Sequence, residues 1–355
     1  MKAPLVSVIV ATFNSARLLP DVLSAIRAQT YPQESIEILL VDGGSKDDTP
    51  AIGKKFRCRI VDNPNVEPVS AKHLGYMEAK GNFIIYIDHD EIMTNLKSIE
   101  ERVRMFQQNP QVKAATGDGY IAPKGYGIIN RYINEFGDPF SFFMYRLSKS
   151  SDFFVSTMRQ RYPVIRTTKQ YEIFDVSASS HAALIELVAG GGMIDAAFFK
   201  KNFPQIVTQP HLIPHLLYLL QKDFPQLAVM KGDALIHYAA DDIKGYLEKI
   251  MWRVKNNIFH TATLGVSGYA GRAEYQRPFF NIKKILFIPY AFSFVLPCMD
   301  ATCLMVTRRD LAYSIHLPLT LLTLGLILYY SVLKVLNIKP ELTSYDGTTK
   351  AYEKK

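Results

Sequence analysis

The chain has 355 residues, about the length of two ordinary domains. Hydrophobic residues make up 48% and charged residues 21%, which excludes a disordered chain, because disorder requires low hydrophobicity and high net charge. The net charge of +8 fits an anionic membrane surface or a phosphorylated substrate as partner. The basic residues form no compact block, so we expect no nucleic-acid partner. Its 3 scattered cysteines are too few for a disulfide framework.

The first hundred residues alternate between strand and helix patterns. Short apolar runs rich in β-branched residues predict strands at residues 5–11, 36–41, 59–61 and 83–87. Apolar residues at helical spacing, with turn residues at the boundaries, predict helices between them. Buried strands joined by helices indicate a mostly parallel sheet with helices on both faces.

Polar residues follow three of these strands, at residues 12–15, 42–48 and 88–91. In an open parallel sheet, ligands bind outside the carboxyl ends of the strands, so we expect the three clusters to face one crevice. Asp88 and Asp90 flank one residue, and carboxylates at that spacing can project to the same side. Such hard oxygen ligands suit Mg²⁺ or Mn²⁺ that also binds substrate phosphates. The alternative is a solvated turn at residues 88–91 and a turn-forming role for Asp42.

These motifs, in this order, resemble the family 2 glycosyltransferases of the GT-A fold. The resemblance is carried by the run VSVIVATFN at residues 6–14, by VDGGS followed by Asp47 and Thr49, and by Ala71-Lys72-His73 with Gly75, Gly81 and Asp88-His89-Asp90. It covers residues 5–95 well and residues 96–240 loosely. Lys72 stands where the family usually has Arg, and it keeps the positive charge without the bidentate fork.

The resemblance implies an inverting sugar transfer, in which an acceptor oxygen attacks the anomeric carbon with help from a general base. The donor would be a nucleotide-diphospho-sugar, with Ala11 and Phe13 against the nucleoside and Asp42 accepting a hydrogen bond from the base. The implied nucleotide-sugar-binding residues are Ala11, Phe13, Asn14, Asp42, Lys72 and Asp88. Mg²⁺ or Mn²⁺ would be held by Asp88, Asp90 and His237; for His237 the alternative is a histidine packed in a strand.

The general base departs from the family pattern. Members usually carry Glu-Asp after a Gly-rich segment, and here Gln209-Pro210 fall at that place after Gly190, Gly191 and Gly192. Neither can accept a proton near neutral pH, whereas the next residue, His211, can. We therefore expect His211 to be the catalytic base, with Asp195 and His215 as further candidates and a cap or core histidine as the alternative for His211.

Two apolar segments close the chain. Residues 285–306 contain one charged residue, Asp300, and residues 311–333 contain none; each reaches the ~20 residues that cross a bilayer. We predict a transmembrane hairpin linked by residues 307–310, with the catalytic domain on the cytoplasmic side, because the flanks carry more Lys and Arg than the link. The alternative is that residues 285–306 lie in the membrane interface.

The predicted fold is therefore α/β, with a GT-A-type mostly parallel sheet followed by a transmembrane helical hairpin. The predicted parts are a nucleotide-sugar-binding half at 1–115, an acceptor-binding half at 116–240, an amphipathic interfacial segment at 241–284, two membrane helices at 285–335 and a polar tail at 336–355. The predicted function is membrane-anchored glycosyl transfer to a polyprenyl-linked or other surface-glycan acceptor. The alternative is a non-catalytic nucleotide-sugar-binding or scaffold subunit that has lost the base.

Overall fold

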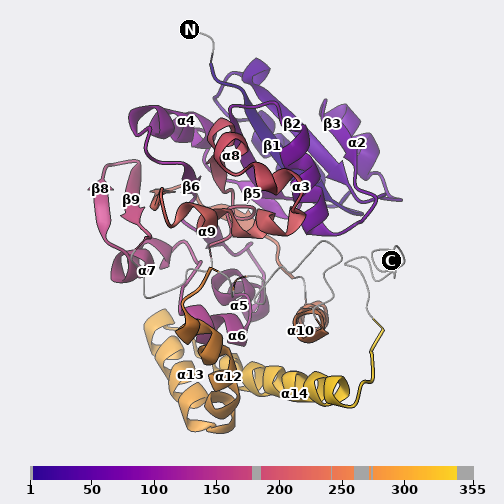
Figure 1. Ribbon diagram of the computed structural model, residues 1–355, viewed down its shortest axis with the longest axis vertical. Coiled ribbons are helices and arrows are strands. Elements are labelled where there is room, and N and C mark those ends of the chain that lie inside the picture. The colour runs from indigo at the N-terminus through magenta and orange to yellow at the C-terminus, as the bar shows by residue number, and fades with distance from the viewer. Residues whose placement is uncertain (1–2, 178–184, 241, 260–271, 273–274, 342–355) are drawn as a thin grey trace.

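The computed structural model describes residues 3–177, 185–240, 242–259, 272 and 275–341. Figure 1 shows a twisted sheet with helices on both faces, and below it a group of helices formed by the end of the chain. In the described part the main sheet has the order β3-β2-β1-β4-β10-β6-β11-β9-β8, and a small sheet has the order β5-β12-β7. The strands are β1 Val6–Thr12, β2 Ile36–Asp42, β3 Arg59–Asp62, β4 Phe83–Asp88, β5 Glu91–Met93, β6 Ala114–Thr116, β7 Tyr120–Ile121, β8 Val164–Thr167, β9 Tyr171–Asp175, β10 Met193–Asp195, β11 Gln226–Met230 and β12 Leu235–His237.

The helices follow the alternation expected from the sequence in the first half of the chain. Along the chain, each α-helix up to α4 lies between two strands. The α-helices are α1 Leu19–Arg27, α2 Thr49–Lys55, α3 Pro68–Glu78, α4 Ser98–Gln108, α5 Ile128–Phe136, α6 Pro139–Tyr145, α7 Phe154–Arg161, α8 Ala196–Asn202, α9 Leu216–Leu220, α10 Ile243–Phe259, α12 Pro278–Phe292, α13 Val295–Arg308 and α14 His316–Val335. Short 3₁₀ helices include η1 Gln33–Ser35, η2 Pro204–Val207, η3 Pro210–His215 and η5 Leu311–Ile315.

The mostly parallel sheet is confirmed for one half of the sheet and wrong for the other. Strands β3, β2, β1 and β4 run parallel, as the strand and helix alternation predicts. Beyond β4 the sheet is mixed, because β10 is antiparallel to both β4 and β6, and β9 is antiparallel to β11. Two parallel strands need a crossover connection between them. Strand β10 instead enters the sheet directly from the Gly-rich turn at residues 190–192.

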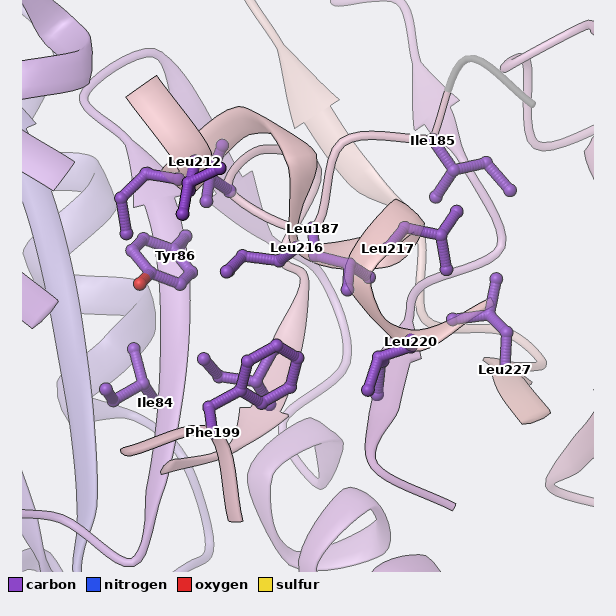
Figure 2. Packing of buried hydrophobic residues seen from close by; sticks show 14 of the residues in the cluster. Ile84, Tyr86, Ile185, Leu187, Phe199, Leu212, Leu216, Leu217, Leu220 and Leu227 are labelled. Carbon is purple, nitrogen blue, oxygen red and sulfur yellow. The ribbon is translucent and has the colours of Figure 1, made fainter. Parts of the chain in front are cut away.

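The core lies on both faces of the central strands. Alternate residues of β4 point to opposite faces, so Ile84 and Tyr86 belong to one cluster while Ile85 and Ile87 belong to the other. Figure 2 shows Tyr86 below Leu212 and beside Leu216, which come from η3 and α9. The central strands are thus buried on both faces, which fixes the position of their carboxyl ends.

The structure does not confirm the predicted transmembrane hairpin. Helices α12 and α13 are bent by 89° where residues 285–306 were expected to form one span, and Phe294 at the bend has a left-handed φ of 53°. The link at residues 307–310 contacts the catalytic domain, since Arg308 donates to Glu135 and Asp310 lies 2.8 Å from Arg131. A link on the far side of a bilayer could not make these contacts. By length and composition, Leu311–Val335 could cross a membrane. The predicted interfacial segment at 241–284 lies partly outside the described residues.

Candidate functional site

The predicted residues at the ends of β1, β2 and β4 lie at one edge of the sheet. The parallel register places Ala11 beside Asp88 on one side and Thr12 beside Asp42 on the other. The Thr12 hydroxyl lies 3.2 Å from the Asp42 carboxylate and donates to it. The prediction that these clusters share one edge is confirmed.

Asp42 shapes the turn that follows β2. Its carboxylate accepts hydrogen bonds from the backbone N–H of Gly44 at 3.1 Å and of Ser45 at 2.9 Å, and from the Ser45 hydroxyl at 2.5 Å. The side chain is buried, with 6% exposure. The turn-forming role weighed for Asp42 is therefore present, and contact with a nucleobase stays a prediction.

The loops after β1 and β2 are held together by Asn14 and Phe13. The Asn14 N–H donates to the Ser45 hydroxyl at 2.8 Å, and its side-chain oxygen accepts from the Lys46 N–H at 2.9 Å. A Cβ at Gly43 would lie 3.2 Å from the Phe13 ring, so the ring lies close over this glycine. The two loops form one wall beside the strand ends, where the sequence predicts the nucleoside.

Lys72 of α3 binds Asp88 through both carboxylate oxygens, at 2.8 and 3.1 Å from its Nζ. Helix α3 can approach this closely because Gly75 faces β1: a Cβ there would lie 2.5 Å from Ile9. Burial lowers the pKa of Lys72, but the charges of Asp88, Glu91 and Glu186 raise it more, so the net shift is upward. Lys72 is therefore a permanent cation at the end of β4.

Asp90 has a different partner, His237 of β12. The Asp90 Oδ2 and the His237 Nε2 are 3.7 Å apart. Strand β12 pairs with β5 and places His237 opposite Glu91, the residue that follows Asp90. Burial alone would raise the pKa of Asp90, but His237 outweighs burial and holds it well below its usual range. Burial likewise lowers the pKa of His237, whereas Asp90 raises it more. The His237 Nδ1 is buried without a hydrogen-bond partner in the described part of the chain.

Glu91 connects this carboxylate turn to its surroundings. It accepts from the Asp88 N–H at 3.0 Å, from the Tyr120 hydroxyl at 2.8 Å and from the Gly190 N–H at 2.9 Å. Burial and the neighbouring Asp88 raise its pKa. The sequence offers only its place after Asp90 as a signal, because the burial of Glu91 depends on segments that are distant along the chain.

A pocket opens beside Glu91. Tyr120 and Gly190 line it together with Gly117, Lys149 and Glu186. Burial lowers the pKa of Lys149, and Glu186 forms an ion pair with Arg272. Burial raises the pKa of Glu186, but Arg272, Lys149 and Lys72 outweigh it and the net shift is downward. From the sequence Lys149 is one of six cations in the basic stretch 146–169, and Glu186 stands outside any motif.

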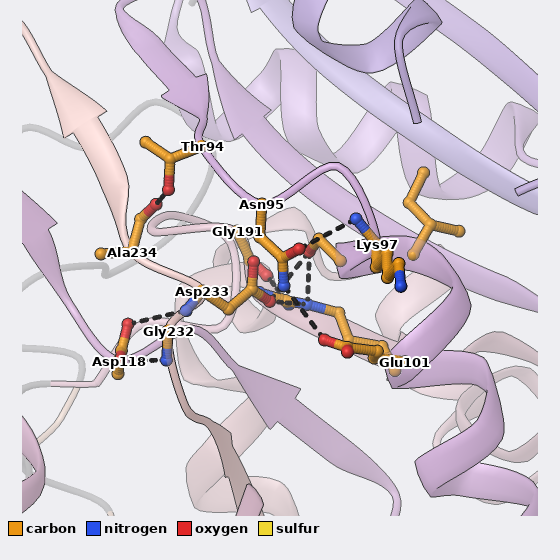
Figure 3. Close-up of polar contacts among 12 residues, drawn as sticks. Thr94, Asn95, Lys97, Glu101, Asp118, Gly191, Gly232, Asp233 and Ala234 are labelled. Carbon is orange, nitrogen blue, oxygen red and sulfur yellow. Dashed lines mark hydrogen bonds and ion pairs between the residues drawn. The ribbon is translucent and has the colours of Figure 1, made fainter. Parts of the chain in front are cut away.

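The Gly-rich turn in the wall of this pocket is held from behind by a buried ion pair. Arg102 lies 2.7 Å from Asp233, both side chains are at most 1% exposed, and Arg102 also donates to the Gly191 carbonyl. Figure 3 shows Asp233 beside Gly191, with Asp118 accepting from the N–H groups of Gly232 and Asp233. The pocket wall is therefore fixed by charges that solvent does not reach.

The candidates for the general base lie at three places. Asp195 pairs in the sheet with Phe83 at the start of β4, forms an ion pair with Lys113 and caps α8. It therefore lies at the opposite edge of the sheet from Asp88, and the prediction that it is the base is wrong. His215 is fully buried between aromatic rings, including that of Tyr275. His211 is half-buried in η3, is not among the residues that line the pocket described above, and stays a prediction as the base.

The side chains at the strand ends form only part of a divalent-cation site. Within the described ranges no three His, Cys, Asp or Glu side chains converge as a preformed metal site, because Lys72 already binds Asp88. Asp90 and the Nε2 of His237 are adjacent, whereas the unpartnered Nδ1 lies on the other side of the imidazole ring. One carboxylate and one imidazole suit an ion that takes its remaining ligands from substrate phosphates and water.

Residues 7–163 match the model of "Glycosyl transferase family 2". This segment is similar to that family. The match covers less than half of the chain, and it includes the strand ends, Lys72, Asp88, Asp90 and Lys149.

The curated relatives that the chain matches are similar over limited lengths. Glycosyltransferase AglE of Haloferax volcanii is 30% identical over 93 residues, which cover 24% of this chain and 31% of the relative. The uncharacterized glycosyltransferase RP339 of Rickettsia prowazekii is 33% identical over 130 residues, which cover 36% and 40%. The chain thus spans less than half the length of these relatives. Among solved structures, mannosyltransferase PcManGT of Pyrobaculum calidifontis, in complex with GDP-Man and Mn²⁺, has a TM-score of 0.49 at 14% identity, covering 95% of this chain and 88% of that one.

Proposed function

We propose that the chain is an inverting glycosyltransferase that moves a sugar from a nucleotide-diphospho-sugar to an acceptor hydroxyl. The observation that carries the proposal is the arrangement at the strand ends. The Asp42 turn and the Phe13 loop stand on one side, and the Asp88–Lys72 and Asp90–His237 pairs stand on the other. The family 2 match over these residues supports the same reaction class.

In the proposed reaction, Asp42, Phe13 and Asn14 bind the nucleoside, and Lys72 keeps Asp88 at the end of β4. Asp90 and His237 would hold Mg²⁺ or Mn²⁺, and the ion would supply Lewis-acid stabilisation of the diphosphate leaving group. The acceptor oxygen bonds to the anomeric carbon as the bond to the diphosphate breaks, and its proton passes to a base. His211 is the base proposed from the sequence. Glu186 is a second candidate, because it lines the pocket beside Glu91 and its pKa is shifted downward, so it is ionised.

We further propose that the enzyme acts at the cytoplasmic face of a membrane on a polyprenyl-linked or other surface-glycan acceptor. The apolar helices at the end of the chain support membrane attachment, and attachment raises the effective concentration of a lipid-borne acceptor. A full-length enzyme that uses a water-soluble acceptor analogue as efficiently as the lipid-linked form would contradict this part.

The test is sugar-nucleotide turnover by the full chain in detergent, with a panel of donors and with or without Mn²⁺. We expect one donor to be used in a metal-dependent way, and Asp90→Asn to lower turnover at least ~100-fold, because a lost metal contact costs several kcal/mol. Asp48→Asn, an exposed carboxylate after β2, is the matched control and should retain activity. His211→Ala and Glu186→Gln then identify the base. Nucleotide binding without turnover on any acceptor would favour the non-catalytic subunit.

A further inference from the structure

The helices at the end of the chain expose apolar faces. On α12 the exposed residues follow each other at helical spacing, and α13 and α14 show the same pattern. Ile285 is 68% exposed and Val306 70%. The set includes Phe279, Ile282, Ile285, Leu286, Phe292, Val295, Leu296, Met299, Val306, Leu322, Tyr329 and Val332. We call this surface the apolar platform. Patches of this kind on a folded domain mark a site of contact with another apolar phase.

The inner side of the same helices packs against the domain through apolar residues such as Phe287, Leu304 and Leu324. Polar groups on this side are paired: Arg146 binds Asp300 through both oxygens at 2.6 and 2.7 Å, and the Tyr290 hydroxyl donates to Asp300 at 2.6 Å. The helices are therefore apolar on the side that packs against the domain and apolar again on the outer side. A helix on a water-exposed surface carries polar residues on its outer side.

Both ends of the bent pair α12–α13 are attached to the catalytic domain. Near the start of α12, Lys283 donates to the Met144 carbonyl at 2.8 Å. At the end of α13, Arg308 donates to Glu135 of α5, and Asp310 pairs with Arg131 at 2.8 Å. The chain therefore leaves the domain and returns to it within this pair. Figure 1 shows α12 and α13 together at the end of the molecule away from β1, β2 and β3.

Helix α14 is also attached at both ends. Its first residue, His316, is buried against Tyr132, and near its end Lys334 donates to the Ile258 carbonyl of α10 at 2.5 Å. Helix α10 itself is fixed to the domain by Arg253, which lies 3.3 Å from Asp138. If α14 crossed a bilayer, α10 would have to enter it as well. Helix α10 carries Lys244, Glu248, Lys249, Arg253 and Lys255, and charges inside a bilayer are costly.

The edges of the apolar platform carry positive charge. Arg277 precedes α12, Arg309 follows α13, and Lys334 and Lys339 stand at the end of α14, all exposed. Cations beside an apolar face complement the anionic headgroups and the acyl region of a membrane surface. An apolar protein partner would not require this border of cations.

We propose that α12, α13 and α14 form a monotopic membrane platform, which enters one leaflet while both of its ends stay on the side of the catalytic domain. The inference rests on the membrane attachment proposed above and is independent of the sugar transfer. It replaces two spans by a shallow, in-plane contact, and it places the link at residues 307–310 on the same side as the active site.

The first test is flotation of the full chain with vesicles after detergent removal. Vesicles of phosphatidylethanolamine and phosphatidylglycerol should bind the chain better than pure phosphatidylcholine. The double substitution Ile285→Gln/Val306→Gln should lower the partition coefficient at least ~10-fold. Val164→Gln/Ile165→Gln is the matched control, since this exposed apolar pair lies on β8, and it should bind like the parent. A chain that stays out of vesicles and self-associates through the platform would overturn the proposal.

The second test measures the side on which each segment lies. Cys58, Cys298 and Cys303 are replaced by Ser, and Lys54→Cys, Arg309→Cys or Lys339→Cys is introduced singly at an exposed position. A membrane-impermeant maleimide is applied to sealed proteoliposomes. We expect all three variants to react to the same extent before detergent is added.

Reaction of the Arg309→Cys or the Lys339→Cys variant only after detergent, when the Lys54→Cys variant reacts before it, would overturn the one-leaflet arrangement. Because neither test uses turnover, a failure here leaves the glycosyltransferase proposal standing. Conversely, an inactive chain with all three positions on one side would leave the platform intact.

Discussion

Asp88 and Asp90 stand two residues apart but have different electrostatic environments. Lys72 neutralises Asp88 within the protein, whereas Asp90 lies 3.7 Å from the imidazole of His237, and the charges of His89 and Lys249 also lower its pKa. A carboxylate already bound by an ammonium is a poorer ligand for a further cation than one beside an imidazole, which can itself be a ligand. The two acids look equivalent in the sequence but differ in their partners, and in the proposed reaction Asp90 is the one that would hold the metal.

His215 gives the protein a predictable sensitivity to acid. Burial, reinforced by Arg272, lowers the pKa of His215 to about 4, and neither ring nitrogen has a hydrogen-bond partner in the part of the chain that the structure describes. The unfolded chain binds the proton near pH 6.5, whereas the native state excludes it. Stability from His215 is therefore complete above about pH 6.5 and falls as the pH drops toward 4, by about 2 kcal/mol at pH 5.

The measurement is the urea unfolding free energy at pH 7.5 and pH 5.0 for the parent and for His215→Phe. The phenyl ring keeps the contact with Tyr275 but does not titrate. All other groups titrate in both proteins, so the parent should lose about 2 kcal/mol more than the variant between the two pH values. Equal losses in parent and variant would show that His215 is not held neutral.

At the scale of elements, the Gly-rich turn before β10 requires residues that have no Cβ. Gly190 and Gly191 have φ values of 64° and 65°, and a Cβ at Gly192 would lie 2.0 Å from the Leu187 carbonyl oxygen. Because that oxygen is backbone, it cannot move without displacing the pocket wall. We expect Gly192→Ala to lower the unfolding free energy by roughly 3 kcal/mol or more and to weaken donor binding.

The comparison for Gly192→Ala is Gly232→Ala. Gly232 also has a positive φ, of 66°, but nothing lies within 4 Å of a Cβ there. Gly232→Ala should lower the unfolding free energy by only about 1 kcal/mol, the cost of holding alanine at a positive φ. Both variants are compared by urea unfolding and by nucleotide-sugar titration. If the two glycines tolerate alanine equally, the close approach of the Leu187 carbonyl does not constrain the turn.

The sequence predicts the elements whose periodicity is strong and misses those that distant segments create. The strands ending at Thr12, Asp42 and Asp88 are continuous apolar runs, so their existence and their common edge follow from the pattern. In the small sheet, β12 lies within residues 234–238, which the sequence predicts as a strand, whereas β5 and β7 have three and two residues and are too short for a periodic signal. Glu91 and Tyr120, which depend on that sheet, could therefore not be assigned.

The C-terminal helices show a different limit of sequence reasoning. Apolar composition predicts contact with a membrane, but composition does not distinguish a span from a helix that lies along a domain. What decides between them is the partner of each polar group. Asp300 pairs with Arg146 and Arg308 with Glu135, and neither pairing is visible before the chain is folded.

At the scale of the whole molecule, Glu135 joins the apolar platform to the pocket. It is 1% exposed and accepts from Arg308, from Tyr313 at 2.5 Å and from Ser148 at 2.9 Å. The Lys149 N–H donates to the Glu135 backbone carbonyl at 2.8 Å, and Lys149 lines the pocket. One buried residue thus links the helices of the apolar platform to the pocket.

Glu135→Gln should therefore loosen the platform from the catalytic domain. The amide keeps the shape but removes the charge that balances Arg308, and breaking one member of such a pair costs about 3 kcal/mol. We expect a lower unfolding free energy and faster tryptic cleavage at Arg308 and Arg309, whereas Asp152→Asn, at an exposed carboxylate, should change neither. Unchanged cleavage together with lost stability would mean that Glu135 stabilises the domain alone. Faster cleavage with donor turnover intact would show that the platform moves independently of the chemistry.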